Sequence, residues 1–207
     1  MSVSRRSVLG LILGSPLVLS ACVGGSFRTF YPEAIPAEVS RGWRVTDVRV
    51  SVPDTLTVSE AKSLLPAADI VWREDPEGDR RAQVATIMRN ATLRGAAGLR
   101  GSRPVVIELA MRRFHALTFE AETRMSDAGV HNIDFLATVV DAGTGMILAG
   151  PVEIEASLPA LSGDQMRAAR ARGESQKSQI SAHVARTIAG WLGVGADPRG
   201  EFSRSGD

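Results

Sequence analysis

The only cysteine of the chain, Cys22, closes an N-terminal segment that limits how the remaining residues can fold. Arg5 and Arg6 precede an apolar run over residues 8–19, and small residues separate this run from the cysteine. A helix needs about 20 apolar residues to span a bilayer, so this run is too short and is typical of a secretory signal peptide. Because the one cysteine lies in this segment, the exported part forms no disulfide bond and depends on its hydrophobic core.

The residues Leu19-Ser20-Ala21-Cys22 resemble the lipobox, Leu-(Ala/Ser)-(Gly/Ala)-Cys, at every position. In a lipobox the cysteine thiol takes a diacylglycerol before cleavage, and the cysteine becomes the new N-terminus. We therefore predict a lipoprotein signal peptide over residues 1–21 and a palmitate-type lipid anchor on Cys22. An ordinary secretory signal with a chance cysteine is the alternative.

Charge and hydropathy bear on the partners of the chain. No other apolar run approaches the length of a membrane-spanning helix, so we expect a protein that is anchored to the membrane through its lipid and does not span it. The formal net charge is +1, and removal of residues 1–21, with Arg5 and Arg6 and no acid, leaves −1. Phosphate binding needs an excess of cations, so nucleic acid is not an expected partner.

Two further features concern the destination of the protein. Residue 23 is valine and not the aspartate that retains many lipoproteins in the inner membrane, so we expect a periplasm-facing location on the outer membrane of the bacterial cell envelope. The segment Ser4–Leu9 is similar to the twin-arginine pattern Ser-Arg-Arg-x-Phe-Leu, with Val8 in place of the phenylalanine. Export by the general secretory route and by the twin-arginine route both remain open.

The mature chain divides into a short N-terminal linker, one domain and a tail. Residues 22–42 contain glycines and prolines with little periodicity and are interpreted as a lipidated tether. The aromatic residues Phe27, Phe30 and Tyr31 within it lie either on lipid headgroups or against the domain. Residues 43–194 are predicted to form an α+β domain, and the polar residues 195–207 a flexible tail.

Alternating apolar residues predict four main strands over residues 43–52, 105–117, 130–140 and 146–158. Apolar residues at helical spacing predict two main helices over residues 79–99 and 176–192. Each strand has one apolar face and each helix one apolar stripe, which indicates a two-layer α+β sandwich with a mainly antiparallel sheet and both helices on one face. The predicted core consists of Val84, Met88, Ile107, Leu109, Phe135, Val139, Val184 and Ile188.

The best candidate site is the group Arg113, His115 and His131. A symmetric antiparallel pairing of 105–117 with 130–140 would place the two histidines close together on the apolar face, with the arginine beside them. They could support the hairpin through hydrogen bonds, contact an anionic ligand or partner, or hold a metal ion with Asp127 or Glu120 as a third ligand. We expect the first role and no metal.

Two charged clusters have simpler interpretations. Arg73-Glu74-Asp75 and Asp79 lie near a predicted helix start, where an acidic residue is expected to cap the helix. Arg167, Arg170 and Arg172 could contact anionic lipid, although a solvated face is the expected role because Asp164 and Glu174 dilute their charge.

The sequence lacks the motifs of common catalytic and cofactor sites. It has no Gly-x-Ser-x-Gly, no Ser-x-x-Lys, no His-Glu-x-x-His, no Walker pattern and no Gly-x-Gly-x-x-Gly between a strand and a helix. We therefore expect no enzyme and no cofactor.

Several blocks together resemble an uncharacterised family of bacterial lipoproteins that is known only as a domain of unknown function. The blocks comprise residues 70–76 with Gly78-Asp79-Arg80, Arg103-Pro104-Val105, residues 113–117, Gly129-Val130-His131, and Asp141 with Thr144-Gly145. The resemblance covers most of residues 43–192 and implies no known activity. More loosely, the order of elements is similar to small α+β envelope lipoproteins, including auxiliary components of lipid transporters.

These observations predict an envelope lipoprotein that acts as a binding or accessory component, structural or transport-auxiliary, with another envelope protein as partner. The alternative is a lipoprotein that binds a small ligand in a pocket near Arg113, His115 and His131. A pocket lined by polar groups with shifted pKa values would favour the alternative, and a filled core would favour the first interpretation.

Overall fold

The computed structural model describes residues 24–126 and 129–205, in which short and long strands alternate with helices along the chain. The strands are β1 (Gly24–Phe30), β2 (Trp43–Ser51), β3 (Ile70–Val71), β4 (Arg103–His115), β5 (Val130–Asp141), β6 (Ile147–Ala156), β7 (Leu158–Pro159) and β8 (Gly200–Ser205). The helices are α1 (Ala37–Ser40), α2 (Arg80–Gly95), α3 (Phe119–Arg124), α4 (Gly163–Ala171) and α5 (Gln176–Trp191).

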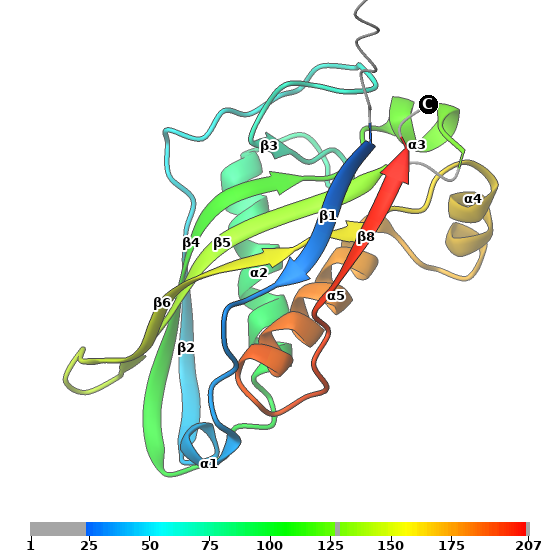
Figure 1. Cartoon of the computed structure of the whole chain (residues 1–207). Coiled ribbons are helices and arrows are strands. Elements are labelled where there is room, and N and C mark those ends of the chain that lie inside the picture. Colours follow the sequence, from blue (N-terminus) through cyan, green and yellow to red (C-terminus); the bar gives the residue numbers. More distant parts are fainter. Residues whose placement is uncertain (1–23, 127–128, 206–207) are drawn as a thin grey trace, which may run out of the picture.

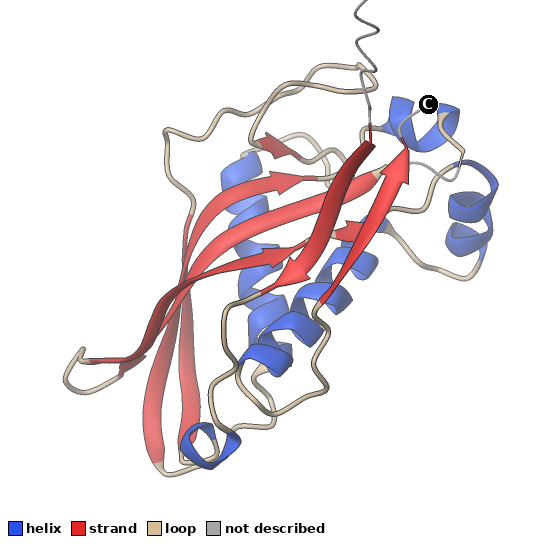
Figure 2. Ribbon diagram, viewed as in Figure 1, coloured by secondary structure: helices blue, strands red, loops and turns tan. Residues whose placement is uncertain are grey.

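All strands join one open sheet, and the two long helices cover one of its faces (Figures 1 and 2). The strand order is β2-β4-β5-β6-β1-β8, while β3 pairs with β4 and β7 with β5. The strands β4, β5 and β6 form an antiparallel meander, whereas β2 runs parallel to β4 because α2 makes the crossover between them. No helix of the described residues packs on the opposite face of the sheet (Figure 2).

The α+β class and the two helices on one face agree with the sequence prediction, but the predicted number of elements was wrong. Over residues 24–126 and 129–205, the sheet has eight strands and there are five helices, instead of about four strands and two main helices. Some of the missed elements are short: β7 has two residues and α1 has four. Segments of this length show no measurable periodicity, so pattern reading misses them.

The sheet extends beyond both boundaries that the sequence predicted for the domain. The strand β1 lies in the expected tether and β8 in the expected tail, and the two pair antiparallel over six residues. The Tyr31 side chain is buried and its hydroxyl donates a hydrogen bond to Asp197 at 2.9 Å. The rings of Phe27 and Phe202 stack at 6.0 Å between centroids. The aromatic residues near Cys22 thus pack against the domain. The glycines at the start of β1 and β8 weaken the strand pattern in the sequence, so neither strand was predicted.

The core lies between the sheet and the pair α2 and α5. All eight predicted core residues are at most 2% exposed, which confirms that prediction. The two helices approach closely at Gly95, where a Cβ atom would lie 2.4 Å from the carbonyl oxygen of Ala185 and 2.9 Å from Ile188. Only glycine allows this contact.

The start of α2 confirms the predicted capping role of an acidic residue. The Asp79 carboxylate accepts hydrogen bonds from the backbone N–H groups of Arg81 and Ala82 at 2.9 and 3.1 Å. This side chain satisfies donors that have no partner within the helix, and its negative charge faces the positive end of the helix dipole.

Candidate functional site

The structure does not bring the three candidate site residues together. A register shift between Met111 and Arg113 inserts one extra residue into β4, so His115 lies opposite Asn132 and not opposite His131. Because side chains alternate between faces, this bulge turns Arg113 and His115 to the helix-free face, while His131 stays on the core side with Ile133. The predicted meeting of the two histidines was therefore wrong.

Arg113 and His115 line a surface groove of about 380 Å³ beside β3, together with residues 66–69 and Thr57. His115 Nδ1 lies 3.3 Å from the carbonyl oxygen of Ala68, and burial lowers the pKa of the imidazole. The Arg113 guanidinium lies 3.8 Å from the Asp134 carboxylate. Burial raises the pKa of Asp134 to about 6, and Arg113 only partly opposes this effect. The groove can hold a small polar group against one cation and one imidazole.

His131 is fully buried in the core. Neither of its ring nitrogens has a hydrogen-bond partner among the described residues. Burial, with smaller contributions from His115 and His183, lowers the pKa of His131 to about 3, so the ring is neutral at physiological pH. Such a residue cannot contact an external ligand or partner without a rearrangement of the core.

Two candidate residues lie outside the described part of the chain. Cys22, the predicted lipidation site, precedes Gly24, and Asp127, a conceivable metal ligand, falls in the gap at 127–128. Within residues 24–126 and 129–205, no three histidine, cysteine or acidic side chains come together in a way that could hold a metal ion. Over the same residues, no helix combines the length and the apolar character that crossing a bilayer requires.

The third histidine of the chain, His183 on α5, forms a contact that sequence reasoning missed. Its Nε2 atom lies 2.9 Å from the hydroxyl of Thr29 on β1, and this hydroxyl donates a hydrogen bond to the carbonyl oxygen of Ser157. Because the hydroxyl proton is used there, the histidine donates to Thr29 and does not act as a base toward it. Burial lowers the pKa of His183 to about 4. The pair therefore links β1 to α5 and does not form a nucleophile with a base.

The acidic residues Glu74 and Asp75, which precede α2, bind the start of α5 and not the start of α2, which the sequence indicated. The Glu74 carboxylate accepts hydrogen bonds from the backbone N–H groups of Gln176 and Lys177, at 3.1 and 2.6 Å, and so caps α5. The next residue, Asp75, accepts from Lys177 Nζ at 2.7 Å and from Trp72 Nε1 at 2.9 Å. Burial raises the pKa of Asp75, but these hydrogen bonds outweigh it and hold the pKa below the usual range. Contacts that span about a hundred residues leave no local sequence signal.

The three arginines of α4 and its C-terminal end are all engaged within the protein. Arg170 binds the buried Glu122 carboxylate at 2.9 Å and Glu74 at 3.2 Å. Arg167 pairs with Asp164, and Arg172 with Glu174 at 2.9 Å. The charges are matched locally, so this region has no cationic excess for anionic lipid.

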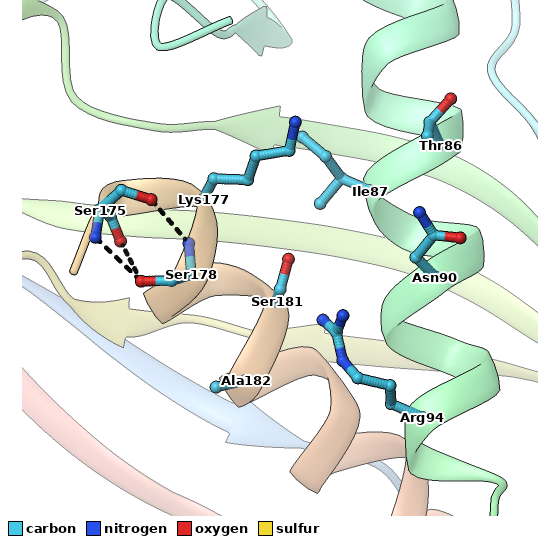
Figure 3. Close-up of a pocket in the computed structure, with 9 residues that line it drawn as sticks. All are labelled: Thr86, Ile87, Asn90, Arg94, Ser175, Lys177, Ser178, Ser181 and Ala182. Atoms are coloured by element: carbon cyan, nitrogen blue, oxygen red, sulfur yellow. Dashed lines mark hydrogen bonds between the residues drawn. The ribbon is translucent and has the colours of Figure 1, made fainter. Parts of the chain in front are cut away.

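A second groove, of about 420 Å³, lies between α2 and α5 on the side away from the sheet (Figure 3). Ser175 and Ser178 at its end are occupied in a capping box, and Lys177 binds Asp75. The side chains of Asn90, Arg94 and Ser181 point into the groove and form no hydrogen bond to any described residue. A guanidinium, an amide and a hydroxyl together suit a small anionic or polar group.

The fold and these sites define a class: a two-layer α+β protein with an open sheet, a filled core and shallow polar grooves among its described residues. The sequence from residue 43 to 207 matches a family of unknown function, DUF6778, and the chain belongs to that family. This confirms the resemblance to an uncharacterised family. No curated protein matches the chain.

Solved structures resemble the chain only distantly. A presumed lipoprotein from Caulobacter crescentus CB15 is 16% identical, with a TM-score of 0.38, over 76% of this chain and 95% of that one. The PelC dodecamer from Paraburkholderia phytofirmans is 13% identical, with a TM-score of 0.34, over 80% of this chain and 96% of that one. Likeness at this level transfers neither assembly nor function to this chain.

Proposed function

We propose that this protein is a lipid-anchored envelope lipoprotein that works by binding another envelope component and catalyses no reaction. One observation carries the proposal: a lipobox cysteine stands two residues before a strand that is built into the sheet of the domain. A lipid on Cys22 would therefore hold the folded domain directly at a membrane surface. The valine at position 23 favours the outer membrane, with the domain facing the periplasm.

The interior of the domain supports a binding role more than a catalytic one. The large side chains between sheet and helices, among them Phe135, Ile154 and Trp191, are at most 1% exposed, so the core is filled. The grooves at Arg113 and Arg94 are open surface features. In the pair of Thr29 and His183, the imidazole donates the hydrogen bond to the hydroxyl, which is the opposite of what activation of a nucleophile requires. Protein surfaces of this kind suit partners that dock from outside.

Small-ligand binding is a second candidate, and the groove between α2 and α5 favours it over the site near His131. Asn90, Arg94 and Ser181 have unused hydrogen-bonding groups there, whereas the His131 ring is enclosed in the core. Titration of wild type and Arg94→Gln with inorganic phosphate, followed by thermal unfolding, tests this function. A stabilisation that the variant lacks would support it.

The main proposal is tested by labelling cells with a fatty-acid analogue that can be detected on the protein. Wild type is expected to carry the label, and Cys22→Ser to remain an unlabelled precursor. Affinity purification of the detergent-solubilised wild type then identifies the component that travels with it. Equal labelling of both forms contradicts the anchor, and recovery of the wild type without any envelope component contradicts the accessory role.

A further inference from the structure

The distance between the lipid and the folded domain is very short. The sheet begins at Gly24, and only two peptide steps separate Gly24 from Cys22, a span of about 7 Å at most. The headgroup region on one side of a bilayer is about 5–8 Å thick. If Cys22 is lipidated, as proposed above, the end of the molecule at which β1 starts cannot leave the headgroup layer.

This end of the molecule carries exposed apolar side chains. The loop between β2 and β3 arches over the same end at which β1 starts and β8 finishes, and α3 lies at that end as well (Figure 1). Leu64 and Leu65 in the loop are exposed, the latter by 78%, and Phe119 at the start of α3 is exposed by 44%. Three of the six exposed large apolar side chains of the described residues therefore lie at the anchored end.

The loop and α3 are joined, so these apolar side chains form one patch. The Thr118 hydroxyl donates a hydrogen bond to the carbonyl oxygen of Ser63 at 2.8 Å, which places Leu64 and Phe119 directly beside a bonded pair. The rest of the loop is also held: Asp69 binds the backbone and hydroxyl of Thr57, and the buried Arg80 binds Glu60 at 2.7 Å. A loop fastened at both sides presents Leu64 and Leu65 outward instead of burying them.

We propose that Leu64, Leu65 and Phe119 form a membrane-contact patch that enters the lipid headgroup region beside the anchor and fixes the orientation of the domain. Exposed leucine and phenylalanine gain free energy when they leave water, and the lipid keeps them within reach of the bilayer. Charge contributes less, because the nearby arginines of α4 are paired and only Lys62 in the loop and Arg124 on α3 are cations without an ion pair among the described residues of these two segments. The hairpin that joins β5 and β6, at the other end, points away from the membrane.

The proposal is tested with tryptophan reporters in the full-length lipoprotein, reconstituted into phosphatidylcholine vesicles. The native Trp43, Trp72 and Trp191 are at most 3% exposed, so they give a background that lipid cannot reach. Leu65→Trp places a reporter in the patch, and Phe119→Trp provides a second one if the first variant folds poorly. Ile147→Trp is the matched control, because Ile147 is 57% exposed but lies at the far hairpin.

Vesicles whose acyl chains are brominated near the glycerol are expected to quench the Leu65→Trp or Phe119→Trp reporter by roughly half, and to leave wild type and Ile147→Trp unchanged. The mass of the same preparation shows whether Cys22 is acylated. An acylated protein whose patch reporters are not quenched, or are quenched no more than the Ile147→Trp control, overturns this inference alone. A protein without a lipid on Cys22 overturns the proposed function and this inference with it.

Discussion

At the scale of single residues, His131 is a polar side chain that is buried in the core and reduces the stability of the folded protein. Its two ring nitrogens have lost water and gained no partner among the described residues, which costs about 1–3 kcal/mol. The ring is flanked by the strand pairing of β5 with β7 and faces away from Arg113. No contact with a described residue explains why a histidine occupies this position.

His131→Leu is expected to raise the free energy of unfolding by about 1 kcal/mol at pH 7, because an apolar side chain of similar size needs no hydrogen bond. Urea unfolding of the two proteins measures the difference. His115→Leu serves as the control and should give no gain, since His115 is half-buried and contacts the Ala68 carbonyl. A clear loss of stability in His131→Leu would show that the ring has a partner that the structure does not contain.

The buried histidines also predict how stability depends on pH. The pKa values of His131 and His183 in the folded protein, about 3 and about 4, lie below the unfolded value of 6.5. Below pH 6.5 the unfolded chain therefore binds protons that the folded chain cannot, so the contribution of these groups is complete above pH 6.5 and is lost as the pH falls.

We expect the free energy of unfolding to fall by roughly 1 kcal/mol per pH unit for each histidine between pH 6 and pH 4.5. Asp134 acts in the opposite direction, because its folded pKa of about 6 lies above its unfolded value of 3.8, but it is one group against two. Urea unfolding across this range gives the slope. Replacement of His131 by leucine and of His183 by glutamine should abolish the fall seen in the wild type, because the remaining contribution of Asp134 has the opposite sign. A free energy of unfolding that rises for the wild type as the pH falls from 6 to 4.5 would refute this account.

At the scale of elements, the N-terminus of α5 depends on a carboxylate from the segment before α2. Glu74 is 12% exposed, binds two backbone N–H groups of α5 and contacts Arg170, so one side chain joins three parts of the chain. The Glu122 carboxylate extends this network through Arg170 and through the Gln176 side chain amide at 2.5 Å. Charge-assisted hydrogen bonds of this type are stronger than neutral ones.

Glu74→Gln is therefore expected to lower the free energy of unfolding by about 1–3 kcal/mol, because it removes the charge that faces the helix dipole and leaves Arg170 less well matched. Glu77→Gln is the matched control: Glu77 is exposed in the same turn and takes part in no ion pair with a described residue. Equal effects of the two substitutions in a urea titration would exclude the proposed cap.

Two bulges, one in β2 and one in β4, show how the strand register bears on the candidate site. The change of apolar phase between Val45 and Val48 predicts a bulge near Asp47, and the structure has a register shift there. The bulge before Arg113 leaves a similar mark, because the apolar residues change phase between Met111 and Phe114, but the symmetric pairing assumed for the two strands overlooks it. The candidate site depended on that one residue, and this explains why the strand was predicted correctly but the site was not.

At the scale of the whole molecule, the sequence predicted the central layers and missed the two strands at one edge of the sheet, β1 and β8. Long periodic segments such as β4, β5, α2 and α5 carry enough residues to define a period, and they form the core. The strands β1 and β8 are stabilised by pairing with each other, although 170 or more residues separate them, and neither has a pattern of its own. Their presence replaces the expected tether with a link of two residues between Cys22, the proposed lipidation site, and the sheet.

The mass of the protein extracted from cell membranes tests the central claim most directly. We predict a mature chain that begins at Cys22 and carries a diacylglyceryl group on its sulfur, with residues 1–21 removed. The mass would then equal that of residues 22–207 plus the lipid, and a fragment containing Cys22 would locate the modification. A mature chain that begins elsewhere, or an unmodified Cys22 thiol in the membrane-extracted protein, would contradict the account.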